Sequence, residues 1–526
     1  MSAPVGPGTR RTARLVALAA FLVFALTGGG RIAGSDEVTM FELSRAMLHG
    51  RIDVPEGATL RGPDGRFYSK NTAGQAVLAM PLVGAAEFAA RAARFRDERA
   101  VLAARFGASF LNAAITAVLL AAFYALARRL GVKPRSALAA TALLGFTTPV
   151  WVYAKSFMAD PLQALGLLLA LGNAALASAG GARSLPDERR RLLFCALGAF
   201  LAVGVKLPML PIVLLALTAL GFRRLSRWIV PLAGVALALV SHLVYNVARF
   251  GNPLETGYGA QASAGGFSTP LPVGLYGLLL SSGKGIVWFA PAVVLAIAGI
   301  AEMLRSRAQS REPRHGEPAR NAAVATVLAS VAGLVEYGTF EQWAGDGSWG
   351  PRYLLPLLAP AFLGVAFALD HATRLRKRMA WALGIAGLVV TLGGVGVYFG
   401  AAMRATGDYP YTLAMTDPRF MEASHFNPRY TPIVVHWRML AADIAAHARG
   451  EMPRIGQAGA ADPRLGVSAA DQQTLVNAID VWWLYARYAG LPAAPLTAAA
   501  IALLAAAIAA AVATRRAAAA EEAARA

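Results

Sequence analysis

The chain has 526 residues, of which 56% are hydrophobic and only 15% are charged. Soluble domains carry roughly 25% charged residues, so this composition excludes an ordinary soluble enzyme, and the apolar excess excludes a disordered chain. A polytopic membrane protein remains, and the net charge of +20 must be interpreted from its distribution along that chain.

Apolar runs long enough to cross a membrane recur through the sequence, because a spanning helix needs about 20 mostly apolar residues. In chain order they are 15–33, 107–127, 136–153, 157–179, 192–206, 208–222, 228–247, 285–304, 321–340, 353–370, 380–400 and 491–513. The two short runs 192–206 and 208–222 are separated only at Leu207, and the second begins with Pro208. If both cross, the fold is an all-α polytopic membrane protein with about twelve transmembrane helices and both termini on one side.

Basic residues gather in alternate loops between these runs. The basic segments are 10–14, 128–135, 183–191, 223–227, 305–320, 374–378 and 515–525. Short loops rich in Arg and Lys stay cytoplasmic, which predicts a plasma (inner) membrane protein with both termini in the cytoplasm. Because these segments carry nearly all of the net charge, we expect membrane lipid rather than nucleic acid as a partner.

The alternation of basic loops also indicates how residues 76–92 lie. This segment is apolar but contains Pro81 and Glu87. If this segment crossed, every later basic loop would lie outside, so we expect an interfacial or re-entrant helix within the first outer loop, 34–106. The domain organisation is then a catalytic membrane module over 1–400, a smaller extracytoplasmic segment over 401–490, and a final helix with a cytoplasmic tail over 491–526. The aromatic residues at 482–488 are typical of an interfacial belt, and the Ala-rich tail 515–526 is expected to be disordered.

The first candidate for chemistry follows the first apolar run directly. Ser35 is suited to cap a helix whose first turn holds Asp36 and Glu37, and acids at that position interact favourably with the helix dipole. The alternative is a carboxylate at the membrane surface that acts as general base toward an acceptor hydroxyl. Successive helix residues point about 100° apart, so only one of the two acids can face a given site.

The second candidate lies in the same loop, where a turn at 63–65 leads to Tyr68 and Lys70. A lone lysine at a membrane surface is usually a snorkelling or lipid-headgroup contact. Near Asp36, its ammonium group is also suited to hold a lipid-linked phosphate.

Further charged residues lie at the predicted outer ends of helices. Asp160, near Lys155, is either a second active-site acid or half of a helix-end ion pair. Arg352 and Lys284 suit either phosphate binding or interfacial anchoring. Lys206 is the one charge within 192–222, where a charge is a functional hypothesis unless it reaches the interface.

The histidines, including His242, His425 and His436, show no metal-ligand spacing. We therefore predict no metal ligands and no required cofactor, although a divalent cation is compatible with the chemistry.

Several stretches resemble the GT-C superfamily of polyprenyl-phosphate-dependent glycosyltransferases, to which protein mannosyltransferases and lipid A aminoarabinose transferases belong. Besides the acidic pair Asp36 and Glu37, these stretches are GRFYSKNTAGQAVLAMPL (65–82), TTPVWVYAKSFMADP (147–161), GNPLETGYG (251–259), GLLLSSGKGIVWFAP (277–291) and GDGSWGPRYLLPLL (345–358). They are spread over most of residues 1–370 and look like the bacterial membrane branch.

The resemblance implies a role for each matching residue. The first acid of the outer loop, Asp36, would be the catalytic base, Glu37 would support it, and Lys70 would contact the donor phosphate. The implied reaction moves a hexosyl or pentosyl group from a polyprenyl-phosphate donor to a hydroxyl of an envelope glycan, lipid or protein, by a single inverting displacement outside the membrane.

The chain departs from the family after the lysine, where an aromatic or Pro-Pro pair is usual and residues 71–73 are Asn-Thr-Ala. A transporter or flippase of lipid-linked glycans is the alternative function, since it also needs many helices and intramembrane charges. The concentration of polar candidates in outer loops favours surface chemistry over that alternative.

Overall fold

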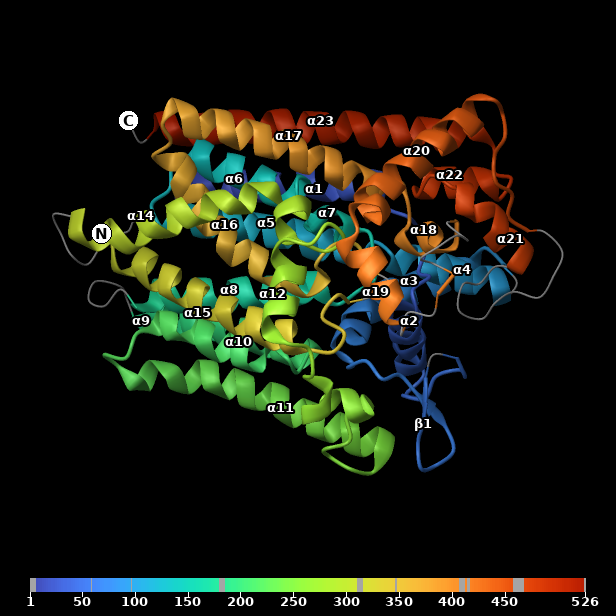
Figure 1. The fold of residues 1–526 in the computed structure, drawn as a ribbon, viewed down its shortest axis with the longest axis horizontal. Coiled ribbons are helices and arrows are strands. Elements are labelled where there is room, and N and C mark those ends of the chain that lie inside the picture. The colour runs from blue at the N-terminus through green and yellow to red at the C-terminus, as the bar shows by residue number, and fades with distance from the viewer. Residues whose placement is uncertain are drawn as a thin grey trace.

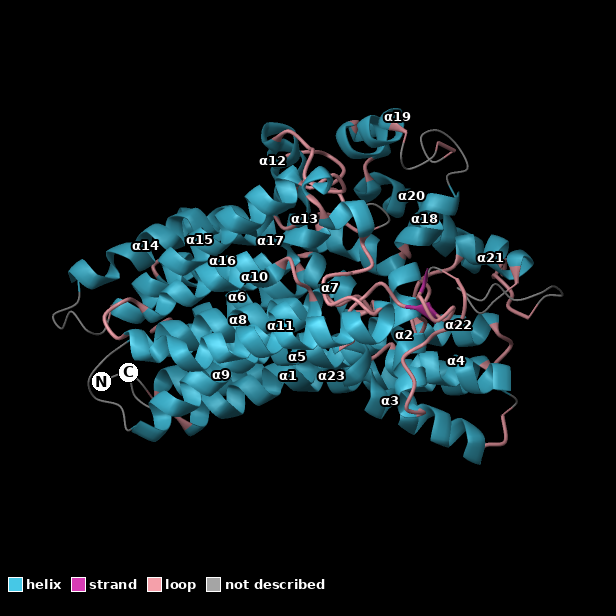
Figure 2. Ribbon diagram, turned by 90° about the horizontal axis from the view of Figure 1, so that it is seen from below, coloured by secondary structure: helices cyan, strands magenta, loops and turns pink. Residues whose placement is uncertain are grey.

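The structure, a computed structural model, describes residues 6–57, 59–95, 97–178, 185–309, 316–345, 348–405, 412–413, 417–456 and 468–524. Within these ranges the chain is almost entirely helical (Figure 2). Two short strands, β1 (Leu60–Arg61) and β2 (Phe67–Tyr68), form an antiparallel hairpin around the predicted turn at 63–65.

Most of the helices that form the body of the molecule are long and run along its longest axis (Figure 1). They are α1 (Pro7–Thr27), α5 (Leu111–Arg129), α6 (Pro134–Phe146), α8 (Asp160–Ser178), α9 (Leu185–Val205), α10 (Met209–Ala216), α11 (Ile229–Phe250), α14 (Leu295–Gln309), α15 (Glu317–Thr339), α16 (Leu355–Asp370), α17 (Arg374–Gly396) and α23 (Ala493–Ala523). The remaining helices are α2 (Ser35–Leu48), α3 (Gly74–Ala92), α4 (Asp97–Ala108), α7 (Pro149–Ala154), α12 (Leu271–Leu279), α13 (Ile286–Phe289), α18 (Phe399–Ala405), α19 (Pro418–Met421), α20 (Pro432–Ala448), α21 (Ala469–Thr474) and α22 (Trp482–Tyr488).

Seven helical stretches of the described chain are long and apolar enough to cross a membrane. They are Arg99–Arg129, Asp160–Ser178, Leu225–Phe250, Glu317–Thr339, Arg352–Asp370, Arg374–Gly396 and Ala493–Ala523. Each overlaps most of one predicted run, so these seven predictions are confirmed by length and composition. The total of about twelve crossings stays a prediction.

Interruptions of the helix explain why some other predicted runs are not among the seven helical stretches of spanning length. Run 136–153 divides into α6 and α7 at Thr148, whose hydroxyl accepts a hydrogen bond from the backbone N–H of Val150. Run 285–304 divides around Pro291, which has no N–H to continue a helix. Run 208–222 forms a shorter apolar helical stretch, Met209–Leu220.

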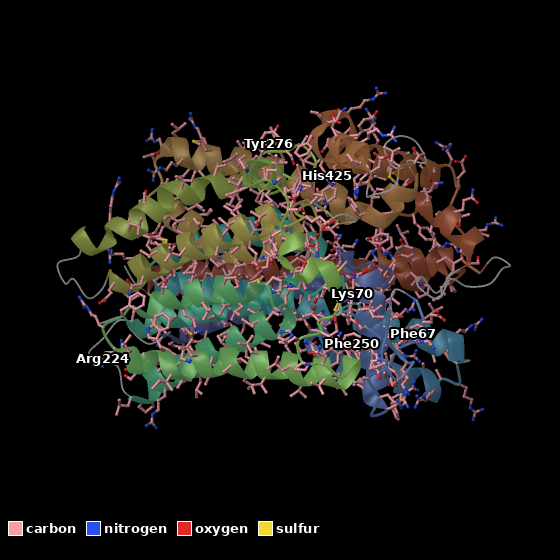
Figure 3. All side chains as sticks on the ribbon, turned by 60° about the horizontal axis from the view of Figure 1, so that its bottom comes forward. Phe67, Lys70, Arg224, Phe250, Tyr276 and His425 are labelled. Carbon is pink, nitrogen blue, oxygen red and sulfur yellow. The ribbon has the colours of Figure 1, made fainter. Side chains whose placement is uncertain are left out.

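The loops predicted to share one side lie together at one end of the bundle. Both chain ends are at that end in Figure 1, and Arg224 lies there in Figure 3. The backbone N–H of Lys133 donates to Asp370 at 2.8 Å, and Arg227 pairs with Glu188 at 2.7 Å. Helices α2 to α4, the hairpin and α18 to α22 occupy the other end (Figure 1). Which end faces the cytoplasm stays a prediction from the loop charges.

The tail prediction was wrong, because α23 continues as a helix to Ala523. Alanine is the best helix former, and the end of this helix is tied to the bundle through Glu521. The Glu521 carboxylate accepts hydrogen bonds from Thr9, Tyr124 and Arg128. The C-terminal end of α23 is thereby attached to the beginning of α1.

The segment 76–92 is helical as expected, as α3, and it is absent from the seven candidate spans of the described chain. It packs against α2 and α4 at the end of the bundle (Figure 1). Glu87 is the one acid within this apolar segment. Its carboxylate pairs with Arg45 of α2 at 2.8 Å. The described part of the first outer loop thus consists of the packed helices α2, α3 and α4 together with the β1–β2 hairpin.

The aromatic residues of α22 contact protein rather than forming a free belt. The indole N–H of Trp482 donates to the Ala25 carbonyl at 2.9 Å, and that of Trp483 donates to the Leu26 carbonyl at 3.2 Å. These bonds hold the segment before α23 against the last turn of α1.

We expect Glu521→Ala to destabilise the protein by about 3 kcal/mol or more, because it leaves the buried guanidinium of Arg128 unpaired. Thermal unfolding of the purified protein in detergent measures the effect as a clear drop in Tm. Glu522→Ala is the matched control, since Glu522 pairs with the exposed Arg135. Equal Tm values for the two variants would contradict the structural role of Glu521.

Candidate active site

Helix α2 begins one residue earlier than it would if Ser35 were its N-cap. The N-cap is Gly34, with φ −71° and ψ 146°, and Ser35 is the first helical residue. The backbone N–H of Gly34 donates to the carboxylate of Glu37 at 2.8 Å. The predicted capping role of Ser35 is therefore wrong, and Glu37 supplies the side chain that closes this helix end.

Glu37 holds the start of α2 against the rest of the molecule. Its second carboxylate oxygen accepts a hydrogen bond from the backbone N–H of Phe157 at 2.5 Å, in the loop before α8. The side chain is buried, and both of its oxygens bind backbone. Glu37 thus fixes the position of its neighbour Asp36 and points away from it.

Asp36 faces a group of cations that come from distant parts of the chain. Its Oδ1 lies 3.2 Å from the Nζ of Lys70, and its Oδ2 lies 3.9 Å from the Nη1 of Arg352. The Asp36 side chain is 18% exposed, so the carboxylate is accessible at the edge of this group. The sequence-predicted base and two predicted phosphate-binding residues are therefore brought together.

Arg352 is itself held by Asp160, the first residue of α8. The Nε of Arg352 lies 3.1 Å from Oδ2 and 3.3 Å from Oδ1 of Asp160, whose side chain is almost fully buried. The predicted ion pair at this helix end exists, but its partner is Arg352 and not Lys155. Arg352 bridges two carboxylates, each in the first turn of its own helix.

Lys70 follows the β1–β2 hairpin, and its position depends on the backbone beside it. The guanidinium of Arg249, at the end of α11, donates to the Ser69 carbonyl at 2.6 Å. The amide of Asn71 donates to the hydroxyl of Thr39 in α2 at 3.1 Å. Figure 3 shows Lys70 near Phe250 at the end of α11, on the inner side of the hairpin marked by Phe67.

Lys206 and Tyr258 complete the group. The Nζ of Lys206 lies 5.4 Å from the centre of the Tyr258 ring, and the Nζ of Lys70 lies 6.0 Å from it. Both ammonium groups therefore lie within cation–π distance of one aromatic ring. The Tyr258 hydroxyl donates weakly to the side-chain oxygen of Asn71 at 3.4 Å.

The charge balance determines the protonation state of Asp36. Burial alone raises the pKa of its carboxyl, but the fields of Arg352, Lys70 and Lys206 outweigh that effect and hold the pKa below its usual value. Asp36 is therefore ionised at neutral pH. Three cations against the two carboxylates of Asp36 and Asp160 leave an excess of one positive charge, which suits an anionic ligand.

Three other predicted site residues lie elsewhere. The hydroxyl of Tyr68 donates to Asp64 at 2.6 Å within the hairpin, and burial together with that bond raises its pKa to about 12. The Nζ of Lys284 donates to the Ser348 carbonyl at 2.8 Å. Lys155 pairs with Asp480 at 3.0 Å.

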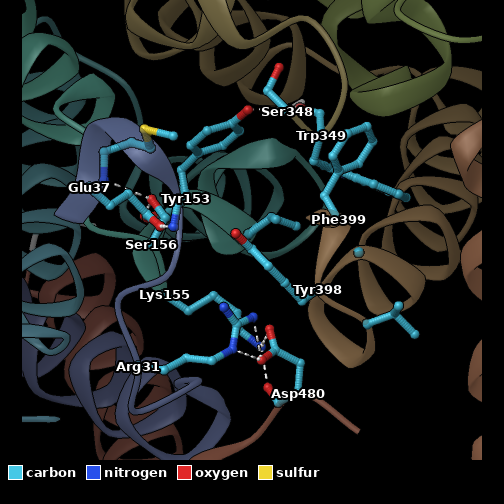
Figure 4. A pocket seen from close by; sticks show the side chains of 15 residues that line it. Arg31, Glu37, Tyr153, Lys155, Ser156, Ser348, Trp349, Tyr398, Phe399 and Asp480 are labelled. Atoms are coloured by element: carbon cyan, nitrogen blue, oxygen red, sulfur yellow. Dashed lines mark hydrogen bonds and ion pairs between the residues drawn. The ribbon is translucent and has the colours of Figure 1, made fainter. Parts of the chain in front are cut away.

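The pair of Lys155 with Asp480 belongs to a second polar cluster that the sequence does not predict. Arg31, just after α1, lies 2.7 Å from the same carboxylate. Burial alone raises the pKa of Asp480, but Arg31 and Lys155 together hold it below its usual value. Figure 4 shows this cluster at one side of a pocket, with Tyr153 and Trp349 at the other.

Of Lys206 and the Arg31–Asp480 pair, the sequence carries a signal only for Lys206. Lys206 is conspicuous in the sequence as an isolated charge in an apolar run, although nothing local connects it to Asp36. The pairing of Arg31 with Asp480 joins residues far apart in the chain, and no local pattern connects them. In the described part of the chain, no three His, Cys, Asp or Glu side chains are grouped closely enough to hold a metal ion.

No family model matches the chain, and no curated protein is significantly similar to it in sequence. The chain is similar to a solved structure of ArnT from Cupriavidus metallidurans bound to undecaprenyl phosphate, with a TM-score of 0.45 and 16% identity, over 89% of this chain and 76% of that one. It is also similar to ArnT from the same organism in the apo state, with a TM-score of 0.43 and 17% identity, over the same shares of both chains.

We expect Asp36 to resist carbodiimide until the pH falls below the usual range of an aspartate, because the reagent attacks the protonated carboxyl and the pKa is lowered. Lys70→Met removes one of the cations that stabilise the ionised form, so the labelling midpoint should move upward by about 1 in pH. Mass spectrometry of the labelled peptide measures both midpoints. The control is Lys133→Met, a lysine at the opposite end of the bundle, and an unmoved midpoint in Lys70→Met would show that Lys70 does not act on Asp36.

Proposed function

We propose that this protein is an integral membrane glycosyltransferase that takes a sugar from a polyprenyl-phosphate donor. One observation carries the proposal: the accessible carboxylate of Asp36 lies at the start of α2 within ion-pair distance of Lys70 and Arg352. The family resemblance of the sequence around these residues points the same way. We further propose that the site faces the extracytoplasmic side of the plasma membrane and that a hydroxyl of an envelope glycan, lipid or protein is the acceptor.

The cations suit the leaving group of this reaction. A sugar linked through phosphate leaves as a phosphate that is already anionic, so it needs neutralising charge more than a proton. Lys70 and Arg352 pair with Asp36 in the structure, and an incoming phosphate would compete for both. Lys206, beside Tyr258, is a third cation near enough to act on the same group.

The carboxylate suits the activation of the acceptor. Asp36 would accept a hydrogen bond from the acceptor hydroxyl and take its proton as the new carbon–oxygen bond forms. The bond from the anomeric carbon to the phosphate oxygen breaks at the same time, and its electron pair leaves with the phosphate. One displacement of this kind inverts the anomeric centre, and no covalent sugar–enzyme intermediate is involved.

Donor binding would also make Asp36 a stronger base. While the cations act on Asp36, its lowered pKa makes it a weak proton acceptor. A bound phosphate offsets part of their positive field, so the pKa of Asp36 rises once the donor is in place. The acceptor hydroxyl is then activated only when a donor sugar is bound for it to attack.

The direct test is release of free polyprenyl phosphate from a labelled polyprenyl-phosphate sugar by the purified protein. A panel of hexosyl and pentosyl donors, with mass detection of the product, identifies the sugar. A transporter or flippase of lipid-linked glycans would move the donor between leaflets of a vesicle and leave it intact.

Asp36→Asn should lower kcat/KM for transfer by about 10²- to 10⁴-fold, because the amide cannot accept the proton of the acceptor hydroxyl. Asp53→Asn is the matched control, since Asp53 is an acid of the same outer loop that pairs with Arg51. Membrane insertion of both variants should match that of the parent protein. Near-normal transfer by the Asp36→Asn variant in a reconstituted assay would rule out Asp36 as the base.

Lys70→Ala should raise the KM for the donor by roughly tenfold, because one charge-assisted contact to the phosphate is lost. The substitution should change the KM for the acceptor little. Arg66→Ala, which removes an exposed cation of the hairpin, is the control. If the dependence of rate on donor concentration is the same in Lys70→Ala and the parent, Lys70 does not bind the donor.

A further inference from the structure

A pocket lies beside the first turn of α2, next to the site formed by Asp36, Lys70 and Arg352. Gly34 and Glu37 line it from α2, Tyr153 from α7, and Trp349 from the segment before α16. Tyr398 and Phe399, at the start of α18, close it toward the C-terminal part of the chain. Tyr153 of this lining is close enough to Arg352 and Asp160 to interact with their charges, so the pocket adjoins the Asp36 site, although none of Lys70, Arg352 and Lys206 lines it.

The positive and negative side chains of this pocket balance one another, and they are already paired within the protein. The Nζ of Lys155 lies 3.0 Å from the carboxylate of Asp480, 2.6 Å from the Val395 carbonyl, and in contact with the Asp480 carbonyl. These three acceptors match the three N–H donors of a lysine. Lys155 therefore has no further donor to offer a ligand.

Arg31 is similarly constrained. Its Nε and Nη2 donate to Asp480 at 2.9 and 2.7 Å, and its guanidinium lies 3.6 Å from the centre of the Tyr398 ring. Arg31 and Lys155 are positive, and Asp480 and Glu37, which also lines the pocket, are negative, so these four groups sum to no net charge. The Asp36 site, by contrast, carries an excess positive charge.

The rest of the lining combines aromatic faces with hydrogen-bonding groups. Tyr153, Trp349, Tyr398 and Phe399 supply four aromatic rings (Figure 4). The indole N–H of Trp349 is buried and has no hydrogen-bond partner among the described residues. A buried donor without a partner costs free energy that a hydrogen-bonding ligand would recover.

We propose that this pocket binds a neutral saccharide ring. A pyranose has apolar C–H faces that pack on aromatic rings and hydroxyls that match polar groups such as the indole N–H of Trp349. An anionic ligand would instead meet cations that are already neutralised by Asp480 and Glu37. The inference rests on the proposed function, and it adds that the sugar ring is recognised by aromatic side chains in a pocket that adjoins the cations around Asp36.

The ring can come from either of two substrates. One is the sugar of the donor, whose phosphate would lie at Lys70. The other is a sugar of a glycan acceptor, whose hydroxyl would reach Asp36. Both sources present the same neutral ring to the pocket.

Saturation-transfer NMR on the full chain in lipid nanodiscs tests the binding without requiring catalysis. The probes are methyl hexopyranosides and methyl pentopyranosides at millimolar concentration, with hexose 1-phosphate as the anionic comparison. Tyr398→Ala and Phe399→Ala should weaken pyranoside binding by roughly tenfold, whereas Tyr398→Phe, which keeps the ring, should retain most of it. Tyr276→Ala is the matched control, because Tyr276 is an exposed tyrosine that stacks on Phe426 elsewhere.

Binding in the parent and in Asp36→Asn, with loss in Tyr398→Ala and Phe399→Ala, supports the proposal even if the transfer assay fails. Three results would overturn it: no pyranoside signal in the parent, an unchanged signal in both alanine variants, or stronger binding of hexose 1-phosphate that depends on the same rings. In the transfer assay, Tyr398→Ala should raise the KM of one substrate. An increase for the donor assigns the ring to the donor, an increase for the acceptor assigns it to the acceptor, and no increase in either overturns the proposal.

Discussion

The ion pairs of Asp36 with Lys70 and Arg352 are the constraint on which the end of the bundle depends. A carboxylate largely removed from water must be paired, and each cation that pairs with it must itself be held in place. Asp160 holds Arg352, and Arg249 holds the backbone beside Lys70. These contacts connect the first turn of α2 to α8, to the segment before α16 and, through the hairpin, to α11.

The first turn of α2 has a second consequence, because its two acids point in different directions. Successive residues of a helix diverge by about 100°, so one acid faces the cations and the other faces the loop before α8. Glu37 binds two backbone N–H groups and anchors the helix, which leaves the Asp36 side chain accessible. A rigid support beside a reactive group is the arrangement that positions a base accurately. Glu37 lines the aromatic pocket and Asp36 faces the cations, so the same divergence makes the two sites neighbours at one helical turn.

Sequence reasoning succeeded where the physical signal is local. Seven apolar runs match helices of spanning length, and the turn at 63–65 forms the β1–β2 hairpin. It failed where a distant group changes the outcome: the tail 515–526 is helical up to Ala523 because Glu521 binds α1 and α5, and Asp160 pairs with Arg352 instead of Lys155. The placement of Ser35 was wrong by one residue, since the Glu37 side chain caps the helix from within.

The sequence by itself determined the class of the protein, the apolar segments, the loops that share one end, and the acids and cations with a capacity for chemistry. Composition and periodicity are sufficient for these features, because burial of apolar residues and the placement of loop charges depend on neighbours in the chain. Only the tertiary structure decided which charges meet. It brought Lys206 and Tyr258 to the Asp36 site and joined Arg31 to Asp480 across most of the chain. An ion pair depends on distance in space, and helices that pack side by side can come from any two parts of a sequence.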